Sequence, residues 1–256
     1  MKQWMILIIA LILLISCSTN AEVDPDKEKS SNDLSSETMY HVESDKYSNN
    51  NINIVYPKIV DFPNNKYVEN INVLIREEAK RIINLYPQEK DNLDINYRIM
   101  LKSNELISIK YYGSGFTEGA AYPLNVFYTS NIDLNKRTRV KLMDLIEINE
   151  SFVKEFKEGK YKSYDGNLDL FDHGVNEEIL SGYNNEDLLN YLKHSDEVDQ
   201  LNESGTFSYI TPDSIGISIS VPHALGDHLE MEISFSNLIN NIKEENKLML
   251  QSIGEE

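Results

Sequence analysis

Apolar and polar residues alternate along several segments of the chain. The clearest case runs from Leu93 to Leu101, where every second residue is Leu, Ile or Tyr and the residues between them are mostly polar. A period of two is typical of a strand with one buried face. Weaker alternation, together with turn residues at the segment ends, predicts further strands. The predicted strands are 52–56, 93–101, 106–112, 124–134, 138–142, 207–210, 215–221 and 228–235.

Other segments carry apolar residues at helical spacing. Val68, Ile71, Ile75 and Ile82 recur on one side of a helix predicted over residues 65–86, and Pro87 fits its end. Residues 159–185 show no regular pattern. Shorter helices are predicted over 144–156, 185–192 and 236–249.

The order of these elements predicts the fold class. Strands occur as hairpins, and helices lie between groups of strands, without regular strand–helix–strand alternation. We therefore predict an α+β fold with an antiparallel sheet and packed helices. We place its N-terminal part at residues 51–135 and its C-terminal part at 136–250. They form either one domain or two intimately associated α/β subdomains.

The N-terminus has the features of an export signal. Lys2 precedes an unbroken apolar run, Met5–Ile15, which is too short for a membrane-spanning helix and fits a signal peptide. Leu14-Ile15-Ser16-Cys17 resembles the bacterial lipobox, in which the cysteine sulfur receives a lipid. We predict cleavage after residue 16 and lipidation of Cys17. An uncleaved anchor helix with an incidental cysteine is the alternative.

Composition limits the partners. The formal net charge is −18, and Cys17 is the one cysteine in the chain, so no internal disulfide can form. Residues 17–50 are rich in Ser, Asn, Asp and Glu and predict a disordered tether. Such acidity disfavours nucleic acid, whose binding depends on Lys and Arg. We expect attachment to the outer face of a bacterial membrane, in a Gram-positive cell, through the lipid on Cys17.

Three short motifs resemble a known family. They are Gly119-Ala120-Ala121-Tyr122-Pro123, Asn131-Ile132-Asp133-Leu134, and Val140-Lys141-Leu142-Met143-Asp144-Leu145-Ile146, and Phe207–Ile215 adds a fourth likeness. Residues 50–245 thereby resemble the ectodomains of RsiV-type anti-sigma factors and the accessory domain of PdaC-type peptidoglycan deacetylases. The resemblance implies a two-part extracytoplasmic domain that binds a ligand, which in the anti-sigma factors is lysozyme. Tyr122 stands where that family often has His. We expect a stand-alone version of the domain.

A glycine-bearing segment is the first candidate for ligand contact. Gly113–Gly119 lacks the Gly-Lys-Ser/Thr ending of a phosphate-binding loop, and Glu118 would repel phosphate. A tight connection between strands is the simpler interpretation. Aromatic residues beside the glycines suit stacking on a sugar ring or capture of a protein loop. The ligand-binding candidates are Tyr111, Tyr112, Phe116 and Tyr122.

Other candidate chemistry is weaker. Asp165, Asn167 and Asp169 have the spacing of the first calcium ligands of an EF-hand, but Leu170 replaces the required Gly. A solvated acidic loop explains them equally. The histidines show no zinc-site spacing, and no serine-nucleophile motif is found. The sequence therefore predicts no cofactor and no catalytic residue.

These observations favour a lipid-anchored extracytoplasmic binding domain. Its expected ligand is a cell-envelope glycan or a protein such as lysozyme. A peptidoglycan-acting enzyme and an accessory subunit of an envelope complex are the alternatives, and the oligomeric state is left open. A broad aromatic face would favour a binder, and a pocket with converging carboxylates would favour an enzyme.

Overall fold

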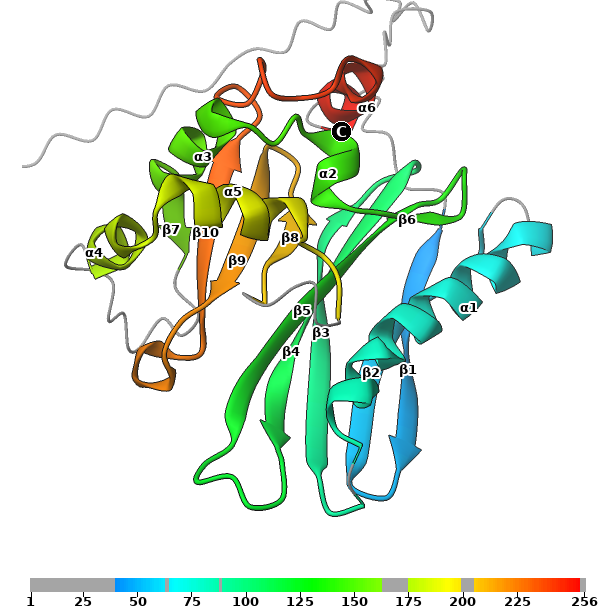
Figure 1. The fold of residues 1–256 in the computed structure, drawn as a ribbon. Coiled ribbons are helices and arrows are strands. Elements are labelled where there is room, and N and C mark those ends of the chain that lie inside the picture. The colour runs from blue at the N-terminus through cyan, green and yellow to red at the C-terminus, as the bar shows by residue number, and fades with distance from the viewer. Residues whose placement is uncertain (1–39, 63–64, 88, 163–174, 199–204, 254–256) are drawn as a thin grey trace, which may run out of the picture. The chain divides into compact units, whose positions relative to one another are not determined.

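A computed structural model describes residues 40–62, 65–87, 89–162, 175–198 and 205–253. Two sheets and several helices make up this part of the chain, which confirms the α+β class (Figure 1). None of the described helices has the length and apolarity needed to cross a membrane.

The first sheet has six strands that follow one another in sequence order. They are β1 (His41–Asn49), β2 (Ile52–Val60), β3 (Asn92–Lys102), β4 (Leu106–Phe116), β5 (Leu124–Asp133) and β6 (Thr138–Val140). All neighbours are antiparallel except β2 and β3, which run parallel. A parallel pair needs a long crossover. Helix α1 (Asn65–Lys80) and the 3₁₀-helix η1 (Arg81–Leu85) supply it.

Helix α1 closes the core of the first sheet. Its buried residues Ile71, Ile75 and Ala79 are spaced by four, so they form one stripe along the helix. They belong to the same apolar cluster as Ile95 and Tyr128 on the sheet. The predicted periodicity over 65–86 is thus confirmed, with the last turn tightened into a 3₁₀-helix.

The second sheet has four strands in the order β7-β10-β9-β8. They are β7 (Lys160–Lys162), β8 (Phe207–Ile210), β9 (Ser214–Ser220) and β10 (His228–Ser234), with the short 3₁₀-helix η2 (His223–Leu225) between the last two. Further helices complete this part: α2 (Leu142–Leu145), α3 (Glu150–Lys157), α4 (Val175–Gly182), α5 (Asn185–Lys193), η3 (Glu244–Asn246) and α6 (Lys247–Ile253). Phe152 and Phe156 of α3 pack with Ile217 and Met231 in a second core.

Two helix predictions are wrong in their extent. The segment 144–156 is divided between α2 and α3, because Ile146 has extended dihedrals and bridges to Ile242. Asn149 then caps α3 by accepting a bond from the backbone N–H of Phe152. The segment 236–249 is mostly turns, and α6 begins only at Lys247. In both places a tertiary contact replaced a helical hydrogen bond.

The predicted tether ends too late. Residues 41–49 form β1, which pairs with β2 through a two-residue turn where Asn50 has a φ of 50°. Asn accepts this left-handed conformation more readily than most residues. As an edge strand with mostly exposed side chains, β1 carries no apolar alternation that a sequence could reveal. Cys17 and the tether residues up to 39 lie outside the described residues.

The glycine segment is also more regular than predicted. Gly113 and Gly115 are strand residues of β4, where a side chain would find no room. A Cβ atom at Gly113 would lie 1.9 Å from the carbonyl oxygen of Asp94, and one at Gly115 would lie 2.0 Å from the Tyr86 hydroxyl. These glycines therefore allow close approach within the sheet, whereas only residues beyond Phe116 form a connection.

The replacement Gly113→Ala tests this packing. We expect the free energy of unfolding to fall by about 1–3 kcal/mol, because the added methyl group must displace the β3 backbone. Urea unfolding followed by circular dichroism measures the change. Gly182→Ala is the matched control, since no atom lies within 4 Å of a Cβ placed there at the end of α4. Equal stability of both variants would contradict the packing argument.

Candidate functional site

The four aromatic candidates do not gather at one place. Tyr111 is fully buried and stacks on Tyr128 with ring centroids 4.7 Å apart. Burial raises the pKa of its hydroxyl, which is 3.3 Å from the Ser130 hydroxyl. The prediction that Tyr111 contacts a ligand is therefore wrong. Tyr111 sits on the inner face of the first sheet, and the next residue, Tyr112, sits on the outer face. No sequence pattern showed which of these two faces is buried.

Tyr112 and Phe116 lie on the opposite, outer face of the first sheet. Side chains along a strand alternate between faces, so Tyr112, Ser114 and Phe116 share one face of β4. Residues directly opposite on a neighbouring strand lie on the same face. The strand register places Asn96 beside Tyr112 and Asn92 beside Phe116. Aromatic rings and amide groups thus alternate over this face.

A polar pocket opens at the end of this face. Its volume is about 350 Å³, within the usual range of about 300–1,000 Å³ for small-molecule sites. Its lining residues come from the β1–β2 turn and from β2, β3 and β4: Asn50, Asn51, Asn53, Asn92, Leu93, Asp94, Ser114 and Phe116. Phe116 is the one sequence candidate that lines it. We call this pocket the asparagine pocket.

Hydrogen bonds from a neighbouring strand and to the connection before β3 hold two amide groups of the pocket in place. The Ser48 hydroxyl donates to Oδ1 of Asn53 at 3.0 Å, and Nδ2 of Asn92 donates to the carbonyl oxygen of Lys90 at 3.1 Å. Each amide side chain has two donor hydrogens and two acceptor lone pairs. One bond therefore leaves most of its capacity for a ligand. Paired donors and acceptors beside an aromatic ring suit a ligand rich in hydroxyl and amide groups.

Sequence reasoning missed the pocket asparagines. Asp94 is a polar position of the alternating segment 93–101, and Asn92 directly precedes that segment. The alternation therefore assigned both residues to an exposed face and to no particular site. Asn53 pairs with Asp94 because β2 and β3 run parallel, and that pairing depends on the crossover through α1. The sequence does show several Asn residues at exposed strand positions. Only the strand order reveals that they lie together in one pocket.

Tyr122 lies at a separate place. It is 48% exposed, and its ring stacks on that of His223 with centroids 3.9 Å apart. Nδ1 of His223 is 3.0 Å from both carboxylate oxygens of Asp227, and Asp227 also accepts a 2.8 Å bond from the backbone N–H of Asn125. These contacts fasten the β9–β10 connection to the start of β5. They give Tyr122 a structural role away from the asparagine pocket.

The other half of the outer face is covered by the second sheet. Oγ1 of Thr129 donates to the carbonyl oxygen of Ser208 at 2.5 Å, and the backbone N–H of Ile210 donates to Oγ of Ser108 at 2.9 Å. Strand β8 is an edge strand, so its outer backbone groups need such partners. Polar side chains of β4 and β5 provide them. On β5 the second sheet reaches Phe127, which packs on Phe207 and His228, whereas Tyr112 and Phe116 of β4 stay partly exposed.

A buried ion pair lies in this junction. Nζ of Lys110 is 2.8 Å from Oε2 of Glu230, and His228 lies on the other side of the same carboxylate. Burial by itself would raise the pKa of Glu230, but the bond from His228 and the charge of Lys110 hold that pKa below its ordinary value. The charges of these groups compensate one another, so a structural role accounts for their burial.

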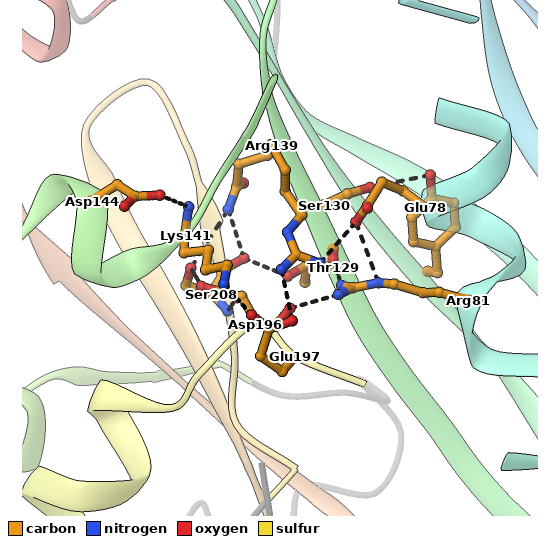
Figure 2. A network of polar contacts seen from close by, with 12 residues as sticks. Glu78, Arg81, Thr129, Ser130, Arg139, Lys141, Asp144, Asp196, Glu197 and Ser208 are labelled. Atoms are coloured by element: carbon orange, nitrogen blue, oxygen red, sulfur yellow. Dashed lines mark hydrogen bonds and ion pairs between the residues drawn. The ribbon is translucent and has the colours of Figure 1, made fainter. Parts of the chain in front are cut away.

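A larger polar network joins α1 and β6 to the segment after α5 (Figure 2). Arg81 donates from Nη1 to the carbonyl oxygen of Asp196 and from Nη2 to that of Thr129, both at 2.5 Å. The Asp196 carboxylate accepts from the backbone N–H of Ser208 at 2.6 Å and of Leu142 at 2.7 Å. Five segments distant in sequence thus meet at the two buried side chains of Arg81 and Asp196.

Glu197 and Arg139 extend this network. Arg139 donates to Glu197 at 2.7 Å, and Lys141 pairs with the other oxygen of the same carboxylate. Glu78 of α1 lies 3.3 Å from Nε of Arg81. Burial lowers the pKa of Arg81, yet the surrounding carboxylates keep a charged guanidinium favourable there. Figure 2 shows these charges directed at one another, as expected of a structural junction.

The remaining chemical candidates give no site. Among the described residues, no three His, Cys, Asp or Glu side chains are placed to hold a metal ion. The calcium candidates Asp165, Asn167 and Asp169, and also His173, lie outside the described residues. His194 contacts the carbonyl oxygen of Asn190 within its own helix end.

Comparison with known proteins bears on the fold. No family model matches the chain, and neither does any curated protein sequence. The fold is similar to that of a DUF3298-family protein. This crystal structure, from Bacteroides fragilis, has a TM-score of 0.51 and 13% identity, and the match covers 86% of this chain and all of that one. A DUF3298-family protein of Pseudomonas aeruginosa has a TM-score of 0.47 and 12% identity, over 81% of this chain and 95% of that one.

The replacement Arg81→Met tests the junction. It leaves the buried carbonyl oxygens of Thr129 and Asp196 without their donor, and we expect a loss of about 2–5 kcal/mol in the free energy of unfolding. Chemical denaturation followed by tyrosine fluorescence measures it. Arg76→Met is the control on the same helix, because Arg76 is exposed and pairs only with Glu77. A loss no larger than the control's would show that the junction is dispensable.

Proposed function

We propose that this protein is an extracytoplasmic binding domain for a cell-envelope glycan, held at the membrane by a lipid on Cys17. The asparagine pocket is the observation that carries the proposal. Amide groups match the paired hydroxyl and acetamido groups of sugars, and the ring of Phe116 offers a surface for their apolar face. This combination supports a glycan as the ligand class.

The composition of the pocket favours binding over catalysis. Hydrolysis of a glycosidic bond commonly uses two carboxyl groups on either side of that bond. Asp94 is the one carboxylate among the residues that line the asparagine pocket. The buried pair Lys110 and Glu230 is occupied in joining the two sheets. A peptidoglycan-acting enzyme is therefore the less supported alternative.

The sequence motifs support the location. The signal-like segment before Cys17 and the lipobox-like residues Leu14–Cys17 would place the domain outside the membrane. The likeness to RsiV-type ectodomains and to the PdaC-type accessory domain agrees with a ligand in the cell wall. A net charge of −18 makes nucleic acid a poor partner.

Lipidation has a direct test. In a bacterial host, Cys17→Ser should move the protein from the membrane fraction to the culture supernatant or to an uncleaved, unlipidated form, because serine cannot form the thioether. Cell fractionation with labelling by a fatty-acid analogue measures both properties. Ser18→Ala is the adjacent control and should stay lipidated. Fatty-acid labelling of the Cys17→Ser protein would contradict the assignment.

Glycan binding is tested with the full-length protein in detergent. Calorimetry with oligomers of N-acetylglucosamine, and sedimentation with purified peptidoglycan, should both show binding. Phe116→Ala should weaken it about tenfold, corresponding to about 1.4 kcal/mol for a lost aromatic contact. Tyr122→Ala removes an aromatic ring outside the asparagine pocket and should leave the affinity unchanged.

Two outcomes would reject the glycan proposal. One is the absence of binding to either glycan preparation by the wild-type protein. The other is binding that Phe116→Ala does not alter. Lysozyme serves as a third ligand: its retention by wild type and by Phe116→Ala alike, with no glycan binding, would favour the protein-ligand alternative.

A further inference from the structure

Arg98 is an exposed cation on the outer face of the first sheet. It lies on β3, two positions after Asn96, and so on the same face as Asn96 and Tyr112. Its guanidinium carbon is 6.0 Å from the centre of the Tyr112 ring. The side chain therefore leans toward the aromatic group that borders the open half of this face.

Arg98 has no ion-pair partner among the described residues. Within the described part of the chain, no carboxylate oxygen lies within 4.0 Å of its nitrogen atoms, whereas its cross-strand neighbour Lys110 is paired with Glu230. The protein has 42 acidic and 24 basic residues. Arg137 likewise has no ion pair among the described residues, but it is only partly exposed, whereas Arg98 is exposed. Its position beside an amide and an aromatic ring suggests an external anion.

Arg98 and the asparagine pocket are arranged in line. Phe116 and Tyr112 are four residues apart on one strand face, or about 13 Å at about 3.3 Å per residue. A short oligosaccharide could cover this length, and a single sugar could not. Asp94 lies between the two ends, opposite Ser114. Its charge disfavours an anionic group at the pocket and favours one at the Arg98 end.

We propose that Arg98, Tyr112 and Asn96 form a second subsite that takes a carboxylate-bearing sugar of the bound glycan. This inference rests on the proposed glycan function and specifies the class of ligand. The planar guanidinium matches the two oxygens of a carboxylate. Tyr112 limits the orientations of the guanidinium, and the Asn96 amide lies beside it to bond a neighbouring hydroxyl group.

The experiment compares two glycans of equal length on the full-length protein in detergent. One is an oligomer of N-acetylglucosamine, which is neutral. The other alternates N-acetylglucosamine with N-acetylmuramic acid, whose lactyl group carries a carboxylate. Wild-type protein should prefer the acidic oligomer about tenfold at low ionic strength, and less at high salt because exposed charges are screened.

Arg98→Gln should abolish this preference while the affinity for the neutral oligomer changes less than twofold. Arg98→Lys should retain part of the preference, since the charge remains but the planar fork is lost. Arg76→Gln is the matched control, because it removes an exposed arginine on α1 that pairs with Glu77 and should keep the wild-type preference. Thermal unfolding checks that all variants are folded.

The outcomes separate the two proposals. Equal binding of both oligomers by wild type, or an unchanged preference in Arg98→Gln, would overturn the Arg98 subsite and leave the asparagine pocket standing. Binding of neither oligomer by wild type would overturn both. A phosphate-bearing envelope polymer is included as a competitor, and its preference over the carboxylate would overturn the assigned ligand class.

Discussion

The buried contacts of Arg81 and Asp196 fix how the two sheets meet. Arg81 bonds to the backbone of Thr129 on the first sheet and of Asp196 after α5. The carboxylate of Asp196 in turn bonds to the backbone of Ser208 at the start of the second sheet. Buried backbone groups are costly to leave without partners, so these bonds define one arrangement rather than several.

This arrangement divides the outer face of the first sheet. Strand β8 lies across the end that carries Ser108 and Thr129, whose hydroxyl groups bond to its backbone. On β3 and β4, the end that carries Tyr112 and Phe116 stays partly exposed, whereas Phe127 of β5 packs on the second sheet. An apolar junction could have slid along the face, since apolar contacts are not directional. Directed hydrogen bonds and the Lys110–Glu230 pair prevent such a shift and keep the asparagine pocket open.

The separation of structural and ligand-facing polar groups has a consequence for function. Charged residues that converge in the junction satisfy one another, which explains their burial without catalysis. Groups on the uncovered face are mainly amides, with Asp94 and Arg98 at different points along the strand. Such a composition suits the recognition of hydroxyl and carboxylate groups that we propose. The binding proposal depends on this contrast between the two halves of one sheet face.

The sequence by itself determined most of the elements and the class of fold. Alternation over 93–101 and helical spacing over 65–86 both correspond to observed elements, because local burial patterns follow the geometry of the backbone. Prediction was poorest where the pattern was weak or where distant segments intervened. The edge strand β1 has no buried face, and the bridge from Ile146 to Ile242 interrupts a helix that periodicity alone would continue.

The site was decided by tertiary structure. Phe116 was identified from its type and its glycine neighbours, whereas Tyr111, chosen on the same grounds, points into the core. Adjacent residues on a strand face opposite sides, and only the packing of α1 settles which side is covered. Asn53 and Asp94 meet because a helical crossover makes β2 and β3 parallel neighbours. The residue types determine which chemical groups the protein can offer. The strand order and the polar junction determine which of these groups lie on the exposed part of the sheet.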